Sequence, residues 1–296
     1  MKKPNFFIIG APRSGTTFMQ KHLGAHSDIF MAKGEPSFFC PDYTKPRLSK
    51  KDYFNLFNEG RDKKIVGEKT VFYLPSKIAP EKIYEFNPQA KILVMLRNPI
   101  EAAYSFHSKM VSVGRETITD FKKAWQKQNK REIKKDRIYK GHLKKKTLIY
   151  GDLYKLGAHL RRYYNRFPKE NVKPILFDSL VENEENVYKE VLQFLDLSFD
   201  DRKDFSKVNP HTQPKSQLIN SLLRVRGILP VEKIKKIFGI KKQIGLLGKL
   251  MRSNQKKIKR EPLEKDFKRE LSNFFKEDVK LLSDLINKDL NHWLED

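Results

Sequence analysis

The chain has 296 residues, and its 61 Lys and Arg against 36 Asp and Glu give a formal charge of +25. With 39% hydrophobic residues it has enough apolar material for a folded core, which excludes wholesale disorder. No window approaches the ~18 apolar residues of a membrane span, and the first apolar run is too short for a signal peptide. The single cysteine, Cys40, excludes an internal disulfide. These features together lead us to expect a cytoplasmic protein.

Apolar runs alternate along the chain with segments of helical periodicity. Several of these runs are apolar throughout, which is typical of a parallel sheet covered on both faces. The fold class is therefore predicted as α/β, with a central parallel β-sheet of about five strands flanked by helices. Strands are predicted at 5–9, 29–32, 64–67, 91–96 and 172–177, and helices at 16–25, 52–59, 78–86, from 99 onward, 152–167 and 184–195.

The C-terminal part of the chain has a different character. Residues 206–217 carry two prolines and are predicted to form a loop. Apolar residues at three-to-four spacing predict a helix over 263–293. Because the sequence has no internal repeat and no low-complexity linker, we expect one domain over 1–296, with a basic and helical extension from about 218.

The first motif, Gly-Ala-Pro-Arg13-Ser14-Gly15-Thr16-Thr17, begins at residue 10 between a predicted strand and a helix. Backbone N–H groups of such a loop and of the first helical turn converge on one point and bind a phosphate, assisted by the helix dipole. The spacing approaches the nucleotide-triphosphatase loop, but Thr16 occupies the position of its lysine. The loop therefore predicts a P-loop-type fold that binds a single phosphate group with Arg13 at its edge.

The second motif follows the strand at 91–96. Arg97 lies at the carboxyl edge of that strand, where α/β sheets bind ligands, and Ser105 lies about two helical turns further on. The guanidinium fork and the hydroxyl can share one phosphate. Together with the first loop, Arg97 and Ser105 predict a site for both ends of a doubly phosphorylated nucleotide.

These two motifs resemble those of the sulfotransferases that use 3′-phosphoadenosine-5′-phosphosulfate (PAPS) as donor. The resemblance continues along most of the chain. The chain looks like a bacterial member of the family that resembles its heparan-sulfate and tyrosylprotein branch. It implies that Arg13, Ser14, Gly15, Thr16 and Thr17 hold the 5′-phosphosulfate. It also implies that the Arg97–Ser105 pair of the second motif holds the 3′-phosphate.

Two further segments resemble the heparan-sulfate branch. Lys-Gly-Glu35-Pro-Ser37-Phe-Phe resembles the stretch whose glutamate is the proposed base, although a glycine is inserted before Glu35 and Ser37 stands where relatives often have histidine. Gly-Glu-Lys69-Thr resembles the segment whose lysine lies near the sulfuryl group. The resemblance thus implies Glu35, Arg13 and Lys69 as catalytic residues.

A late loop, Asn-Pro-His211-Thr-Gln-Pro-Lys215-Ser, resembles the segment that closes over the nucleotide in bacterial members, which implies that Lys215 contacts the 3′-phosphate. His211 and His107 are interpreted as structural or solvent residues. The seven histidines are scattered and the cysteine is single, so the sequence predicts no metal site.

Two basic segments hold most of the excess charge, with a net +10 over 121–146 and +12 over 218–260. They fit either solvated helix faces or peripheral contact with a polyanion or the anionic inner membrane. The pattern at 228–251 is typical of an interfacial helix, although three glycines interrupt it. No nucleic-acid-binding module is present in the sequence.

Three functions remain open from the sequence. The first is transfer of a sulfuryl group from PAPS to a hydroxyl or amine of a carbohydrate, lipid or small molecule, with no metal. The second is a nucleotide or small-molecule kinase, which the absent loop lysine and the Arg97 motif disfavour. The third is a non-enzymatic protein that binds polyanions or membranes. The phosphate motifs favour the first.

Overall fold

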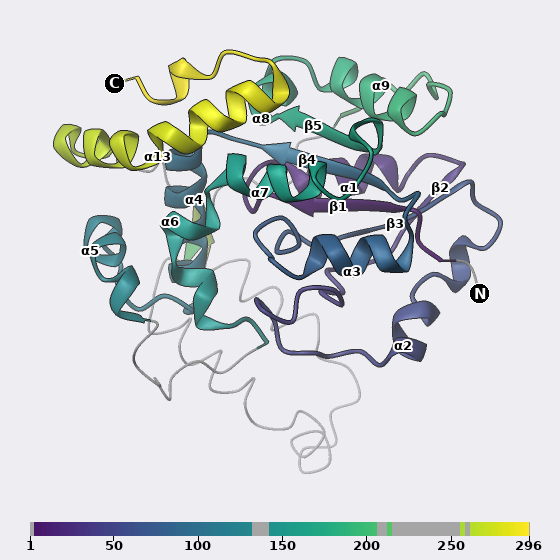
Figure 1. Ribbon diagram of the computed structural model, residues 1–296, viewed down its shortest axis with the longest axis horizontal. Coiled ribbons are helices and arrows are strands. Elements are labelled where there is room, and N and C mark those ends of the chain that lie inside the picture. Colours follow the sequence, from purple (N-terminus) through teal and green to yellow (C-terminus); the bar gives the residue numbers. More distant parts are fainter. Residues whose placement is uncertain (1–2, 132–141, 206–211, 215–254, 258–260, 296) are drawn as a thin grey trace, which may run out of the picture. The chain divides into compact units, whose positions relative to one another are not determined.

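The structure is a computed structural model, and it describes residues 3–131, 142–205, 212–214, 255–257 and 261–295. Five parallel strands form the central sheet in the order β2-β3-β1-β4-β5, which confirms the predicted α/β class (Figure 1). The strands are β1 (Phe6–Gly10), β2 (Ile29–Met31), β3 (Ile65–Lys69), β4 (Lys91–Leu96) and β5 (Val172–Leu176). Strand β1 is central, so its carboxyl end lies between those of β3 and β4.

The helices follow the strands in alternation, as the periodicity predicts. The helices predicted from 16, 78, 99 and 184 begin at or next to those residues, those predicted over 52–59 and 263–293 end earlier, and the helices at 121–126 and 177–182 were not predicted. They are α1 (Thr16–Leu23), α2 (Lys50–Asn55), α3 (Ala79–Phe86), α4 (Pro99–Ser112), α5 (Phe121–Gln126), α6 (Tyr150–Leu153), α7 (Leu156–Tyr164), α8 (Phe177–Glu182), α9 (Glu184–Phe194) and α13 (Lys265–Ile286), with short 3₁₀ turns at 58–60, 128–131, 145–148, 169–171 and 291–293.

The core explains why the strands are apolar throughout. Successive side chains of a strand point to opposite faces of the sheet. Phe6 and Ile8 of β1 therefore join one buried cluster with residues of α1 and α9, while Phe7, on the opposite face, packs edge-on against Phe39. All five residues of β1 are buried. A sheet with both faces covered holds the carboxyl ends of β1, β3 and β4 rigidly, and the functional residues follow those ends.

The helix predicted over 152–167 is two helices, so that prediction was wrong at its start. Helix α6 ends at Leu153 and α7 begins at Leu156. Between them the Tyr154 hydroxyl donates to the carbonyl oxygen of Pro12 at 3.0 Å. Both carboxylate oxygens of Asp278, in α13, accept from the first amides of α7 at 2.9 Å. Two long-range contacts therefore stabilise a break that local periodicity does not reveal.

Residues 108–119 and 209–262 form a compact unit of their own, and the central sheet belongs to the other unit of the chain. Within it β6 (Thr212–Pro214) pairs antiparallel with β7 (Gln255–Lys257). The prediction of a loop over 206–217 was therefore wrong at 212–214, where the chain forms a strand. The basic segment 228–251 lies outside the described residues. The single domain over 1–296 stays a prediction.

The C-terminal helix α13 packs along α7, and its buried residues include Phe267, Leu271 and Phe275. Beyond it the Trp293 indole N–H donates to Asp178 at 2.7 Å, and the Asn98 side-chain amide donates to the carbonyl oxygen of Trp293 at 2.7 Å. The end of the chain is thereby joined to α8 and to the start of α4.

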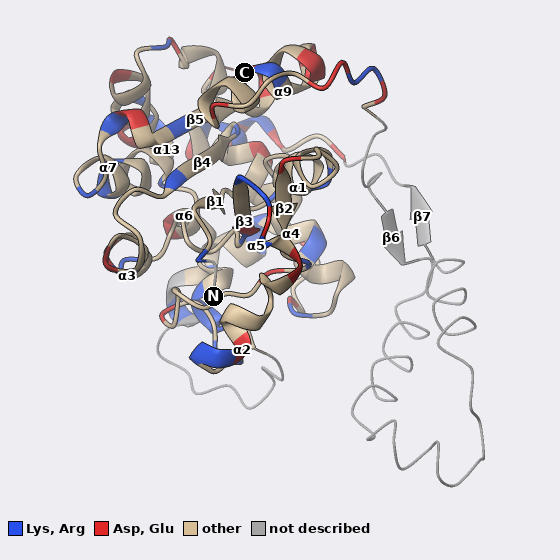
Figure 2. Cartoon of the chain, turned by 90° about the vertical axis from the view of Figure 1, so that its right-hand side faces the viewer, with Lys and Arg blue, Asp and Glu red and all other residues tan. Residues whose placement is uncertain are grey.

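Charge is mixed over the described part of the chain. Figure 2 shows Lys and Arg beside Asp and Glu on its helices. The two basic segments of the sequence lie largely or partly in 132–141, 215–254 and 258–260, outside the described residues. Among the helices that the structure describes, none combines the length and the apolar composition of a membrane span.

Candidate active site

The loop from Gly10 to Gly15 leaves the central strand and enters α1. Gly10 has φ of +141°, and a Cβ there would lie 2.7 Å from the carbonyl oxygen of Val71, so only glycine allows this close approach. Gly15, with φ of +85°, is the N-cap of α1. Arg13, with φ of +67°, also has the left-handed conformation. Left-handed residues that alternate with others turn successive N–H groups toward one point, which is an anion-binding arrangement.

The structure brings Arg13, Arg97 and Ser105 together. The Arg13 Nε donates to Ser105 Oγ at 3.0 Å, and an Arg97 terminal nitrogen donates to the carbonyl oxygen of Arg13 at 3.3 Å. Burial lowers the pKa of the Arg13 guanidinium, and the neighbouring Arg97 lowers it further. Two adjacent cations at the carboxyl ends of β1 and β4 make a positive field that suits an anion.

Two neighbours of Arg97 were missed by sequence reasoning. Glu101, one helical turn on, accepts from Arg97 Nε at 3.2 Å and forms an ion pair with its terminal nitrogen at 2.5 Å. The Arg97 guanidinium also lies over the Phe177 ring, 4.5 Å from its centroid. Glu101 could have been found from its i, i+4 spacing. Phe177 follows β5, whose place beside β4 is known only from the sheet order.

Ser14 tests whether this loop fits a phosphate. Its side chain is fully buried, and among the described residues its Oγ has no hydrogen-bond partner. Buried hydroxyls in proteins are nearly always bonded, so this one fits a ligand oxygen. Thr16, in the first turn of α1, is buried, whereas Thr17 is exposed. The loop residues therefore fit a phosphate group, with Arg13 beside it.

The second cluster lies at the carboxyl end of β3, where Lys69 is the last residue of the strand. Lys69 Nζ forms an ion pair with Glu35 Oε1 at 2.7 Å, and the Val71 amide lies 3.4 Å from the other carboxylate oxygen. The Lys69 side chain is only 7% exposed, whereas that of Glu35 is 32% exposed. The two residues, 34 apart in sequence, thus form one acid–base pair.

Backbone contacts hold this pair beside the phosphate loop. The Thr70 amide donates to the carbonyl oxygen of Ile8 at 3.0 Å, and the Leu74 amide donates to that of Ile9 at 2.8 Å. The Ala11 amide donates to the carbonyl oxygen of Met95 in β4 at 2.6 Å. The segments after β1, β3 and β4 are therefore tied together at one edge of the sheet, where parallel α/β sheets bind ligands.

A buried carboxylate, Glu68, lies directly before Lys69 and was not singled out from the sequence. It accepts hydrogen bonds from the hydroxyls of Tyr53, Thr70 and Tyr73 at 2.6, 2.9 and 2.9 Å. Burial raises its pKa to about 7, although these three bonds act in the opposite direction. An acidic residue in a buried strand was the available signal, because such a residue needs bonding partners.

The remaining candidates from the sequence are Lys215, His211 and His107. Lys215 and His211 are outside the described residues. His107 is buried and its ring packs against Phe121 and Tyr150, as a structural histidine would. Within the described ranges no group of three or more His, Cys, Asp or Glu side chains is arranged to hold a metal ion.

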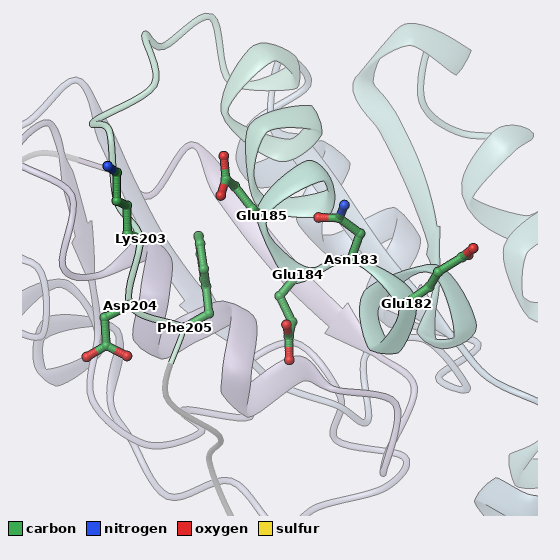
Figure 3. A pocket seen from close by; sticks show the side chains of 7 residues that line it. All are labelled: Glu182, Asn183, Glu184, Glu185, Lys203, Asp204 and Phe205. Atoms are coloured by element: carbon green, nitrogen blue, oxygen red, sulfur yellow. The ribbon is translucent and has the colours of Figure 1, made fainter.

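A pocket at the start of α9 is unsuited to an anion. Figure 3 shows that acidic side chains dominate its lining. With four carboxylates and one lysine it would repel a nucleotide phosphate. Its lining residues are Glu182, Asn183, Glu184, Glu185, Lys203, Asp204 and Phe205.

Comparisons with protein families, with curated proteins and with solved structures all find sulfotransferases. The profile of the family described as "Sulfotransferase domain" matches residues 3–282. Human heparan sulfate glucosamine 3-O-sulfotransferase 6 is 30% identical over 109 residues, 37% of this chain and 31% of that protein. The membrane-associated sulfotransferase kil1 of Dictyostelium discoideum is 30% identical over 103 residues, 34% of this chain and 22% of that protein.

Among solved structures, a sulfotransferase from Alicyclobacillus acidocaldarius is 26% identical, with a TM-score of 0.74 and coverage of 100% of both chains. The matches to the two curated relatives span less than a third of those proteins.

Proposed function

The chain belongs to the sulfotransferase domain family, and from its two side-chain clusters we propose that it transfers a sulfuryl group from PAPS to an acceptor hydroxyl or amine. One observation carries the proposal: Lys69 at the end of β3 pairs with Glu35, which follows β2, and Arg13, which follows β1, contacts Ser105 of α4, which follows β4, all beyond the same edge of one sheet. In this proposal Glu35 supplies the base beside β3, and Arg13 and Arg97 supply cations at the ends of β1 and β4.

The cation cluster suits a nucleotide with two phosphates on one ribose. The 5′-phosphosulfate would occupy the loop at Arg13 and Ser14, and the 3′-phosphate would lie between Arg97 and Ser105. Thr16 stands at the loop position where a triphosphate site has its lysine, which favours this ligand over an extended triphosphate. Lys215 is proposed as a further contact of the 3′-phosphate.

In the proposed reaction the acceptor oxygen forms a bond to sulfur while the bond from sulfur to the phosphate oxygen breaks. The electron pair of that bond stays on the leaving phosphate, where Arg13 and the loop amides stabilise the developing charge. Glu35 accepts the acceptor proton, and Lys69 stabilises the sulfuryl oxygens. The products are the sulfated acceptor and 3′,5′-diphosphoadenosine.

For the acceptor we propose a carbohydrate or a glycolipid. The support is the relative named for heparan sulfate, together with the exposed fraction of Glu35, which leaves its carboxylate open to a large substrate. Peripheral contact with an anionic membrane or polyanion through 218–260, and a cytoplasmic location, stay predictions.

The test is an acceptor screen with sulfur-labelled PAPS and mass detection. Desulfated glycans, glycolipids and tyrosine peptides are offered in parallel, and ATP replaces PAPS in a second series. Sulfated glycan or glycolipid from PAPS alone supports the proposal. Phosphorylated product from ATP, or no affinity for 3′,5′-diphosphoadenosine, contradicts it.

A further inference from the structure

We propose that Glu68 is a positioning residue, which fixes the loop that carries Glu35 through two hydroxyl relays. The inference rests on the proposed function for the role of Glu35 as a base. Its structural part concerns how firmly the backbone of residues 35–39 is held in one conformation, and this does not depend on any substrate.

The first relay runs through Thr70. The Ser37 amide donates to Thr70 Oγ1 at 3.1 Å, and the Thr70 hydroxyl donates to Glu68 Oε2 at 2.9 Å. All three side chains are buried, so water does not replace these bonds. The proton of the hydroxyl is directed to the carboxylate, which leaves a lone pair for the loop amide.

The second relay runs through Tyr73. The amides of Phe38 and Phe39 lie 3.0 and 3.4 Å from the Tyr73 hydroxyl, which donates to Glu68 Oε1 at 2.9 Å. In its ionised form the Glu68 carboxylate only accepts hydrogen bonds, and this form sets the direction of both relays. Three consecutive loop amides are thereby bonded to hydroxyls that one buried carboxylate orients.

The loop needs such support because its backbone is strained. Ser37 has φ of +55°, a conformation that non-glycine residues rarely adopt. The Ser37 carbonyl oxygen also accepts from the Thr44 hydroxyl at 3.3 Å. Glu35 lies two residues before this point, so the strained turn at Ser37 determines whether its carboxylate faces Lys69.

The chain offers a matched control in Tyr53. Its hydroxyl donates to Glu68 at 2.6 Å, as that of Tyr73 does, and its ring stacks on Phe38 with centroids 4.3 Å apart. Tyr53→Phe removes a hydrogen bond to the same carboxylate and keeps the ring packing. Because its hydroxyl is in neither relay, this variant separates the stability of the buried cluster from the order of the loop.

The experiment compares Tyr73→Phe and Thr70→Val with Tyr53→Phe in the full chain by hydrogen–deuterium exchange of the peptide that spans 35–40. Loss of a buried hydrogen-bond partner shifts a local equilibrium by about 5- to 100-fold. We expect both relay variants to exchange faster by about that factor, and Tyr53→Phe to exchange at the wild-type rate. Equal exchange in all three variants overturns the proposal.

The second readout is kcat for PAPS-dependent transfer with the acceptor found in the screen, measured per folded molecule. We expect the relay variants to lose at least about tenfold in kcat while affinity for 3′,5′-diphosphoadenosine stays within a few-fold. Faster exchange with unchanged kcat would overturn the positioning role. Failure of the proposed function has a different signature, since the wild-type chain would then lack nucleotide affinity or transfer.

Discussion

The two halves of the site are built in different ways. On the proposed donor side, backbone geometry and cations dominate: Arg13 donates to Ser105, and Arg97 lies over the Phe177 ring. On the proposed acceptor side, a carboxylate network dominates: Glu35 pairs with Lys69, and Glu68 accepts three hydroxyl bonds. The first half has surplus positive charge, whereas the second has paired charges.

From this difference we expect that donor binding and proton transfer can be altered separately. A residue of the donor side interacts with charge that the nucleotide carries in both ground and transition states, so its loss weakens binding. A residue of the acceptor side acts when the proton leaves the acceptor, so its loss lowers turnover. The predictions below can break or sharpen this separation.

The largest effect is expected for Glu35→Gln. The amide keeps the size of the side chain but removes its proton affinity, and general-base catalysis contributes typically ~10²–10⁴-fold. We expect turnover to fall by that factor and affinity for 3′,5′-diphosphoadenosine to stay within a few-fold. Turnover and calorimetric affinity are measured on the same folded variant, and a variant that retains more than about a tenth of wild-type turnover would assign the base elsewhere.

The next effect is expected for Arg97→Ala. A charged hydrogen bond to phosphate contributes on the order of 1.5–3 kcal/mol, so affinity for 3′,5′-diphosphoadenosine should fall by about 10- to 150-fold. Arg97→Lys is the control, because it keeps the charge but loses the fork geometry and should have an intermediate affinity. Affinity for 5′-AMP should change little in both. A wild-type chain that binds the two nucleotides equally would contradict the 3′-phosphate assignment.

A pH effect on stability is expected from Glu68. Burial raises its pKa from 4.5 to about 7, so between these values the folded chain binds more protons than the unfolded chain. Its contribution is therefore present at low pH and is lost as the pH rises. Relative to Glu68→Gln, the wild-type free energy of unfolding should fall by up to about 1.4 kcal/mol per pH unit in this window.

Urea denaturation of both chains from pH 4.5 to 8 provides the measurement. The hydroxyls of Tyr53, Thr70 and Tyr73 and the charge of Glu35 face this carboxyl group and are the same in both chains. A difference between the two chains that is independent of pH would show that Glu68 has an ordinary pKa.

The smallest effect is expected for Asp278→Ala, far from both halves. Its carboxylate accepts from the amides of Gly157 and Ala158, and loss of such a helix cap costs about 0.5–2 kcal/mol. Asp278→Asn should retain only part of this stability, because its single amide oxygen accepts from one of the two amides and its NH₂ group cannot accept from the other. Thermal unfolding measures the loss. Nucleotide affinity and turnover per folded molecule should be unchanged, which separates lost stability from lost function.

Sequence reasoning performed well where the signal is local. The strand at Lys91–Leu96 has its predicted bounds, and the phosphate loop leads into α1 at Thr16 as expected. Apolar runs and turn-forming residues act over a few positions, so they can be recognised without the fold. The break at Tyr154 was missed because its stabilising partners, Pro12 and Asp278, lie more than a hundred residues away.

The sequence by itself determined the class of fold. It also determined the two motifs that predict phosphate binding and the charged residues of the candidate site. Only the tertiary structure decided which of them touch: Arg13 with Ser105, 92 positions apart, and Lys69 with Glu35, 34 apart. It alone revealed Glu68, because one acidic residue in a strand has no pattern of its own. The physical reason is that a hydrogen bond depends on distance in space, and the order of the parallel strands, rather than the order of residues, sets that distance.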